Sequence, residues 1–163
     1  GMLQYAMSKQ WPAGVSFVLG DAGDPKQAGI GDNVDAVFMA YGIRNLPDPD
    51  SGLANIRSII KPGGTIVLHE YTLDGHRRSR WIWNAVASGI VIPLGRLLTG
   101  RADLFRYLRK SVVQFDTVDR LMERLVAAGF EDVTAHRMPG WQAGIVHTIV
   151  AHKPDTRNTD GQS

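Results

Sequence analysis

Three short polar segments, each following an apolar run, hold the side chains whose chemistry is most readily used. The segments are Gly20-Asp21-Ala22, Tyr41-Gly42-Ile43-Arg44 and Glu70-Tyr71-Thr72. Ligands gather at the carboxyl ends of strands in open α/β sheets, so these segments predict a single binding edge. Arg44 could pair with Glu70 across neighbouring strand ends, and such a pair would order the site without doing chemistry.

The composition narrows the kinds of site that the chain can hold. Its 163 residues suit one domain over residues 2–153, followed by a polar tail over residues 154–163 that is expected to be disordered. A net charge of +2 is too small to argue for nucleic acid. There is no cysteine, and the five histidines lack a tight ligand spacing, so no metal site is predicted. The longest apolar stretch, residues 81–98, is interrupted by polar residues and falls short of the roughly 20 apolar residues of a membrane span.

Strand-like runs alternate with helical patterns along the first half of the chain. We expect a short helix over residues 2–9 and strands over residues 15–19, 34–41 and 65–69. A helix lies between the last two strands. Asp48 can cap this helix, Pro49 suits its first turn, and the turn Lys61-Pro62-Gly63-Gly64 ends it.

The second half predicts more helix and a closing pair of strands. An irregular helical section covers residues 81–109 and a regular helix covers residues 117–128. Strands are expected near residues 132–137 and 144–152, and their closeness in sequence predicts an antiparallel edge. The alternation as a whole predicts an α/β layered fold with a mainly parallel sheet.

Several of these segments resemble one known family in their order and spacing, the ubiquinone/menaquinone-biosynthesis C-methyltransferases (the UbiE family). The matching segments are Tyr41-Gly42-Ile43-Arg44-Asn45-Leu46, Lys61-Pro62-Gly63-Gly64, Arg106-Tyr107-Leu108 followed by Ser111, Ala128-Gly129-Phe130 and Gly144-Ile145-Val146. The resemblance covers nearly all of residues 2–153. It implies a Rossmann-like class I methyltransferase that uses S-adenosylmethionine.

The resemblance also implies roles for particular residues. Asp21 would accept a hydrogen bond from the adenine amino group, and the Ala22 N–H would serve a ring nitrogen; a plain acidic turn is the alternative reading of Asp21. The implied cofactor-binding residues are Gly20, Asp21, Ala22, Ala40 and Tyr41. Tyr41, Arg44 and Glu70 are the implied catalytic residues: residues 41–45 would line the crevice between cofactor and acceptor, and Glu70 is a candidate base.

The implied acceptor is a small quinol-type molecule that is methylated on carbon. A base that removes the phenolic proton would help this reaction. The candidates are Glu70, Tyr41 and His147. His69 should face away from Glu70 on a strand, and it is expected to be structural.

Family members begin with elements that this chain does not show: a strand with a glycine-rich loop, a helix, and a strand ending in an acidic residue. The expectation is an N-terminally truncated sheet that lacks its first two strands and first helix. Those strands would lie between the strands at residues 15–19 and 34–41, so two apolar edges stay unpaired and a homodimer or a rearranged sheet is predicted. The alternative to an enzyme is therefore a truncated, non-catalytic protein that dimerises and does not bind the cofactor.

A basic segment leads into the helical middle of the chain. His76, Arg77, Arg78 and Arg80 surround the start of a tryptophan-rich run at residues 81–83. Residues 76–95 could rest on a membrane surface, where a prenylated substrate would be found, or form a lid or dimer contact. The expected location is cytoplasmic, peripheral to the membrane, with no nucleic-acid partner.

Overall fold

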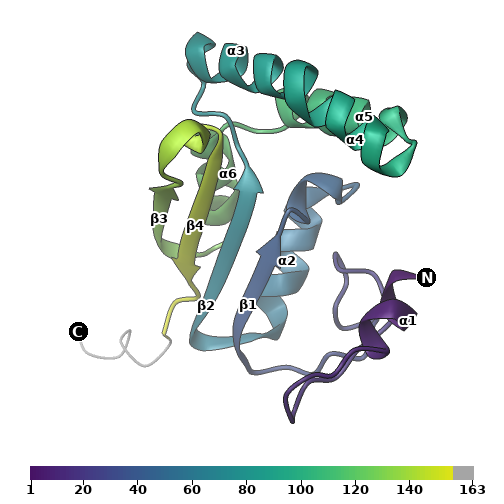
Figure 1. The fold of residues 1–163 in the computed structure, drawn as a ribbon. Coiled ribbons are helices and arrows are strands. Elements are labelled where there is room, and N and C mark those ends of the chain that lie inside the picture. Colours follow the sequence, from purple (N-terminus) through teal and green to yellow (C-terminus); the bar gives the residue numbers. More distant parts are fainter. Residues whose placement is uncertain (156–163) are drawn as a thin grey trace.

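A computed structural model describes residues 1–155 of the chain, and it contains one four-stranded sheet (Figure 1). The strands are β1 (Val34–Ala40), β2 (Ile60–Tyr71), β3 (Glu131–Arg137) and β4 (Val146–His152), in the order β1-β2-β4-β3. Strands β1 and β2 are parallel, whereas β4 is antiparallel to both β2 and β3. The α/β class and the antiparallel edge are confirmed. The sheet is mixed, because it holds one parallel pair where a mainly parallel sheet was predicted.

Apart from α1, the helices of the described residues fall into two groups around the sheet. They are α1 (Met2–Met7), α2 (Pro49–Ile59), α3 (Arg77–Val86), α4 (Ile92–Thr99), α5 (Ala102–Gln114) and α6 (Val118–Ala127), with short turns η1 (Ile43–Asn45), η2 (Ala87–Val91) and η3 (Gly140–Gln142). Helices α2 and α6 lie against one face of the sheet (Figure 1). Helices α3, α4 and α5 form a layer beyond the carboxyl end of β2 (Figure 1). This layer matches the irregular helical section expected over residues 81–109.

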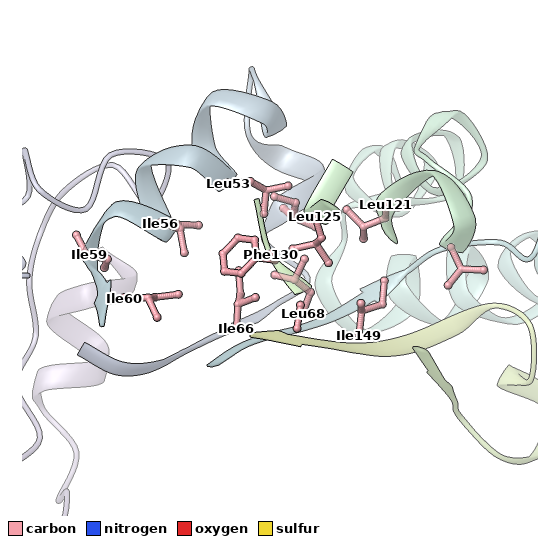
Figure 2. Packing of buried hydrophobic residues seen from close by; sticks show 13 residues of the cluster. Leu53, Ile56, Ile59, Ile60, Ile66, Leu68, Leu121, Leu125, Phe130 and Ile149 are labelled. Carbon is pink, nitrogen blue, oxygen red and sulfur yellow. The ribbon is translucent and has the colours of Figure 1, made fainter. Parts of the chain in front are cut away.

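The main apolar core lies between the sheet and the helices α2 and α6 (Figure 2). Its buried members come from every one of these elements and include Leu53, Ile56, Ile66, Leu68, Leu121, Leu125, Phe130 and Ile149. Spacings of three and four residues on the helices, and of two on β2, place these side chains on the facing surfaces. A second buried cluster joins α3 and α5 to the top of the sheet through Leu73, Trp83, Ala87, Val112, Ile145 and Val146.

The helix α2 begins and ends through specific contacts. The Asp48 carboxylate accepts hydrogen bonds from the backbone N–H groups of Asp50 and Ser51, as an N-terminal cap should. At the other end, the Lys153 ammonium donates to the carbonyls of Arg57 and Ile60, at 3.0 and 2.6 Å. The last carbonyls of a helix lack intrahelical donors and carry partial negative charge, so this cation stabilises them.

The turn at Lys61-Pro62-Gly63-Gly64 lies within β2 as an irregularity, and strand pairing already starts at Ile60. Gly63 has a φ of +72°, which favours glycine. A Cβ on Gly64 would stand 2.9 Å from the Asp35 carbonyl oxygen, so only glycine fits there. The helix therefore passes directly into the strand that carries Glu70.

The predicted strand over residues 15–19 is wrong, because this segment forms a loop. A strand needs a neighbour that accepts and donates its backbone hydrogen bonds, and no strand of the described residues lies beside this segment. Leu19 is 83% exposed and Phe38 of the edge strand β1 is 69% exposed. The Gly23 end of the loop is nevertheless held to α2, because the Asn55 amide donates to the Gly23 carbonyl.

The expected tail falls mostly outside the described residues, since residues 156–163 are not part of them. Pro154 and Asp155 are half-buried next to the end of β4. The remaining elements of the second half follow the prediction closely. In α6, for example, Thr117 caps the start and Val118, Leu121 and Leu125 are buried.

Candidate functional site at the ends of β1 and β2

Tyr41 follows β1 in a conformation that few residues other than glycine adopt. Its φ is +54°, which costs a non-glycine residue roughly 1–2 kcal/mol. Three hydrogen bonds hold it there: its N–H donates to the His69 carbonyl, its own carbonyl accepts from Asn45, and its hydroxyl lies 3.0 Å from His69 Nε2. The strained backbone thus aims the Tyr41 hydroxyl at the imidazole of the neighbouring strand.

His69 links Tyr41 to a third strand. Its Nδ1 lies 2.9 Å from the Thr148 hydroxyl, and the two residues are direct partners in the β2–β4 pairing. In the tautomer with its proton on Nδ1, the ring donates to Thr148 and accepts the Tyr41 hydroxyl proton on Nε2. Tyr41, His69 and Thr148 therefore form a hydrogen-bonded relay across three strands.

The sequence analysis missed the part that His69 plays in this relay. Strand alternation does turn His69 away from Glu70, as expected. The same alternation turns it toward the face used by the Tyr41 hydroxyl. Ala40 pairs with His69 in the parallel register, and Tyr41 follows Ala40 directly. This position of Tyr41 just beyond the strand could have predicted its contact with His69.

Aromatic rings continue from the relay toward the helical layer. The Tyr41 and Tyr71 ring centroids are 5.0 Å apart, and Tyr71 lies at the same distance from Trp83 of α3. Burial and the negative charge of Glu70 raise the pKa of Tyr41, and burial raises the pKa of Tyr71. Both hydroxyls therefore keep their protons at neutral pH. This row of rings, Tyr41, Tyr71 and Trp83, is called the aromatic wall below.

Arg44 and Glu70 form the buried ion pair that the sequence suggested. Their side chains are only 6% and 1% exposed, and Arg44 Nε lies 3.4 Å from Glu70 Oε1. This distance is long for a charge-assisted hydrogen bond, and the tighter contact of Arg44 is to the Ser111 hydroxyl of α5, at 2.6 Å. Glu70 also accepts from the Tyr71 backbone N–H. The pair joins η1, β2 and α5, and its catalytic assignment stays a prediction.

His147 is buried on the Glu70 face of the sheet, directly opposite Glu70 in the β2–β4 register. Its Nδ1 lies 2.8 Å from the Thr72 carbonyl oxygen and so carries the proton, while Nε2 is buried with no hydrogen-bond partner among the described residues. Burial lowers the His147 pKa, and the positive charge of Arg137 adds to this effect. The hydrogen bond to the Thr72 carbonyl and the negative charges of Asp74 and Asp119 oppose it. The ring is neutral at pH 7 and lies away from the Tyr41 relay.

The arrangement of the strands is that of the class I S-adenosylmethionine-dependent methyltransferases. Human N-acetylserotonin methyltransferase, solved with S-adenosylmethionine, matches with a TM-score of 0.56 and 21% identity, over 91% of this chain and 36% of its own. The CurJ carbon methyltransferase matches with a TM-score of 0.53 and 23% identity, over 83% of this chain and 34% of its own. At such identities the likeness shows the fold alone.

The chain belongs to the ubiE/COQ5 methyltransferase family, whose sequence profile matches residues 2–153. The ubiquinone/menaquinone biosynthesis C-methyltransferase UbiE of Ectopseudomonas mendocina is 32% identical over 141 residues, which are 86% of this chain and 53% of that protein. UbiE of Shewanella oneidensis is 31% identical over 99 residues, 61% of this chain and 39% of that protein. The chain therefore spans about half or less of the length of these relatives.

The residues implied for the cofactor fit its adenine end. Gly20, Asp21 and Ala22 are exposed, and one oxygen of the Asp21 carboxylate accepts from the Gly23 N–H while the other makes no hydrogen bond within residues 1–155. Ala40 is exposed at the end of β1. Residues 1–155 hold no strand followed by a glycine-rich loop and a helix, so the fit does not extend to the ribose. The structure records no bond between the Asp21 turn and the relay within this range.

The ion pair at Arg44 gives a stability prediction. Replacing Glu70→Leu leaves the Arg44 guanidinium buried without its charge partner, so the free energy of unfolding should fall by about 3–5 kcal/mol in urea denaturation. The double variant Arg44→Met with Glu70→Leu removes both charges and should regain most of that loss. Glu123→Leu, in the exposed pair with Arg120, is the control and should change stability by less than about 1 kcal/mol. A double variant no more stable than Glu70→Leu would contradict the assignment.

His147 predicts part of the pH dependence of folding. Because its folded-state pKa lies below the ordinary value of 6.5, the unfolded chain binds the proton first as the pH falls. Its contribution to stability is present above about pH 6.5 and is lost as the pH falls below that value. His147→Asn keeps a donor near Nδ1 and cannot titrate, so it should lose less stability than the wild type between about pH 7 and pH 5. Thermal melts across this range measure the difference.

The control is His136→Asn, on exposed β3, which should behave as the wild type. Equal losses of stability for His147→Asn and the wild type would refute the prediction.

Proposed function

We propose that this chain takes part in methyl transfer from S-adenosylmethionine to a ring carbon of a quinol-type precursor. Family membership supports the reaction, and the names of the two UbiE relatives support the class of acceptor. The observation that carries the proposal is the relay of Tyr41, His69 and Thr148 beside the aromatic wall. A phenolic acceptor needs both a proton acceptor and a flat apolar surface, and this edge of the sheet offers both.

When bound, S-adenosylmethionine supplies a sulfonium methyl group that is already electrophilic. The protein has to orient the ring and receive a proton. Tyr41 is 38% exposed, so its oxygen can accept the phenolic proton of the acceptor while its own proton moves to His69 Nε2. In the tautomer with the proton on Nδ1, His69 donates to the Thr148 hydroxyl and its Nε2 is free to accept. Once the ring carbon carries the methyl group, that carbon would lose its proton to solvent, and the acceptor oxygen would regain its proton from His69 through Tyr41, which restores the aromatic ring and resets the relay.

The aromatic wall would orient the acceptor. The partly buried Tyr71 contacts both Tyr41 and the buried Trp83, with each ring centroid 5.0 Å from that of Tyr71. The Trp83 indole N–H donates to the Arg109 carbonyl, which fixes the ring. Flat ring surfaces about 5 Å apart favour stacked or edge contacts with a further ring. Asp21 and Ala22 are the residues proposed to hold the adenine end, and Gly20, Ala40 and Tyr41 are the other residues proposed to contact the cofactor.

A second candidate function is a non-catalytic homodimer, and it is favoured by the exposed apolar side of β1. Phe38 of β1 is 69% exposed, and Leu19, which is 83% exposed, lies in the loop that was expected to be a strand. An open strand edge with apolar side chains can pair with a second copy. Such a dimer would not require the Tyr41 relay.

A methyl-transfer assay separates the two candidates. The chain is incubated with methyl-labelled S-adenosylmethionine and a demethylated quinol, and the labelled product is counted. Tyr41→Phe removes the relay hydroxyl and should lower kcat/KM by about 100-fold, because general acid–base groups contribute roughly this much. Tyr5→Phe, on exposed α1, should keep the wild-type rate. A wild-type chain that sediments as a dimer and transfers no methyl group would support the second candidate instead.

A further inference from the structure

One continuous helical stretch of the chain is unusually apolar and unusually exposed. Residues Arg77–Thr99 run through α3, η2 and α4, and by length and composition this stretch is able to cross a membrane, although only 17% of its most apolar part is buried. The sequence analysis predicted no such stretch. The π-helical turn η2 lies just before Pro93, and such a turn accommodates a residue without an N–H while the helix continues.

The fold argues against a crossing. Trp83 and Ala87, in the middle of the stretch, are each 1% exposed and pack with Ile145 and Val146 of the second cluster. A crossing helix would have to withdraw these side chains from the protein. The stretch is therefore anchored along one side, and its other side lies on the surface of the molecule.

That outer side carries large apolar residues, here called the apolar face. Its members are Trp81, Ile90, Leu94, Leu97 and Leu98 of the long stretch, with Leu104 and Tyr107 of α5. Leu97 and Leu98 are 81% and 74% exposed. Helices α3, α4 and α5 together form one layer at an end of the molecule (Figure 1). Clustered exposed apolar side chains of this size mark an interaction surface.

The same layer carries most of the positive charge of the chain. Residues 76–114 hold eight arginines and lysines and a single acid, Asp103, so their net charge is +7. The whole chain has a net charge of +2, so the remaining residues carry −5. All eight cations are exposed: Arg77, Arg78, Arg80, Arg96, Arg101, Arg106, Arg109 and Lys110. An apolar surface bordered by cations can bind a partner whose own apolar region is bordered by anions, as the acyl chains of an anionic bilayer are bordered by phosphates.

Two hollows on this layer share Arg106. One, of about 480 Å³, is lined mainly by the apolar Ile92, Pro93, Leu97 and Ala102 with Arg96 and Arg106. The other, of about 360 Å³, is lined by Arg106, Arg109 and Lys110 together with Asn84, Val113 and Gln114. An apolar hollow next to a cationic one suits an acyl chain next to its phosphate.

We propose that the apolar face docks on an anionic lipid bilayer, with the α3–η2–α4 stretch lying in the headgroup region and the arginines on lipid phosphates. A membrane contact was expected over residues 76–95. In the structure the most exposed members of the apolar face, Leu97 and Leu98, lie just beyond that range, and α5 also contributes. Nucleic acid would match the charge alone, since it offers no apolar surface to Leu97 and Leu98. The proposal is independent of the methyl-transfer function.

Flotation with vesicles tests the proposal on the full chain. The chain should float with phosphatidylcholine vesicles that contain one-third phosphatidylglycerol, and much less with pure phosphatidylcholine. Leu97→Ser with Leu98→Ser should lower the partition coefficient at least about tenfold through lost apolar burial. Arg96→Gln with Arg106→Gln should lower it by a similar factor on anionic vesicles only, and added salt should mimic this change.

Matched controls come from α6, which packs against one face of the sheet and is not part of the α3–α5 layer. Val126→Ser and Arg120→Gln are exposed changes of the same chemistry and should float as the wild type. Three results would overturn the proposal. The first is that the wild type does not float with anionic vesicles, and the second is that the Leu97/Leu98 variant floats as well as Val126→Ser. The third is a wild-type dimer that the Leu97/Leu98 variant converts to monomer, because this would assign the face to a second copy.

Discussion

The buried pair of Arg44 and Glu70 is the interaction on which the rest of the site depends. It connects the turn after β1, the carboxyl end of β2 and, through Ser111, the helix α5. A charge buried at 1–6% exposure needs a partner, so the three elements cannot separate without leaving an ion unpaired. The pair therefore fixes how the helical layer sits over the strand ends. The positions of Tyr41 before Arg44, and of Tyr71 after Glu70, follow from it.

Strand β2 divides the site into two faces with different tasks. On one face Glu70 and, across the pairing, His147 are enclosed by protein, and their bonds go to other protein groups. On the other face His69 bonds to Tyr41 and Thr148, and the Tyr41 hydroxyl is within reach of a ligand. Placing charge on the closed face and neutral, hydrogen-bonded groups on the open face keeps the open face apolar enough for a ring. The aromatic wall leads from there to α3, whose outer side forms the proposed lipid-binding face.

The sequence predicted the elements whose signals are local. The cap at Asp48, the turn at Gly63 and Gly64 and the apolar spacing of α6 were each readable from a few neighbouring residues. The strand at residues 15–19 failed because a strand also depends on a partner that its own residues do not specify. The Arg44–Glu70 pair was predictable from strand ends, whereas the Tyr41–His69 contact required the register of β1 on β2 and the positive φ of Tyr41. The helical section over residues 81–109 was predicted, whereas the continuity of residues 77–99 as one helix of membrane-spanning length was not, because polar residues and Pro93 interrupt its apolar pattern.

The central claim is that this chain holds part of a site for S-adenosylmethionine, made by the Asp21 loop and the carboxyl ends of β1 and β2. Calorimetric titration with S-adenosylhomocysteine tests it most directly. The account predicts saturable binding that Asp21→Asn weakens by at least about tenfold, since a hydrogen bond to a carboxylate is worth roughly 1.5–3 kcal/mol. Asp24→Asn, in the same loop, should leave the affinity unchanged. No heat of binding at millimolar ligand, or equal affinities for the two variants, would contradict the account.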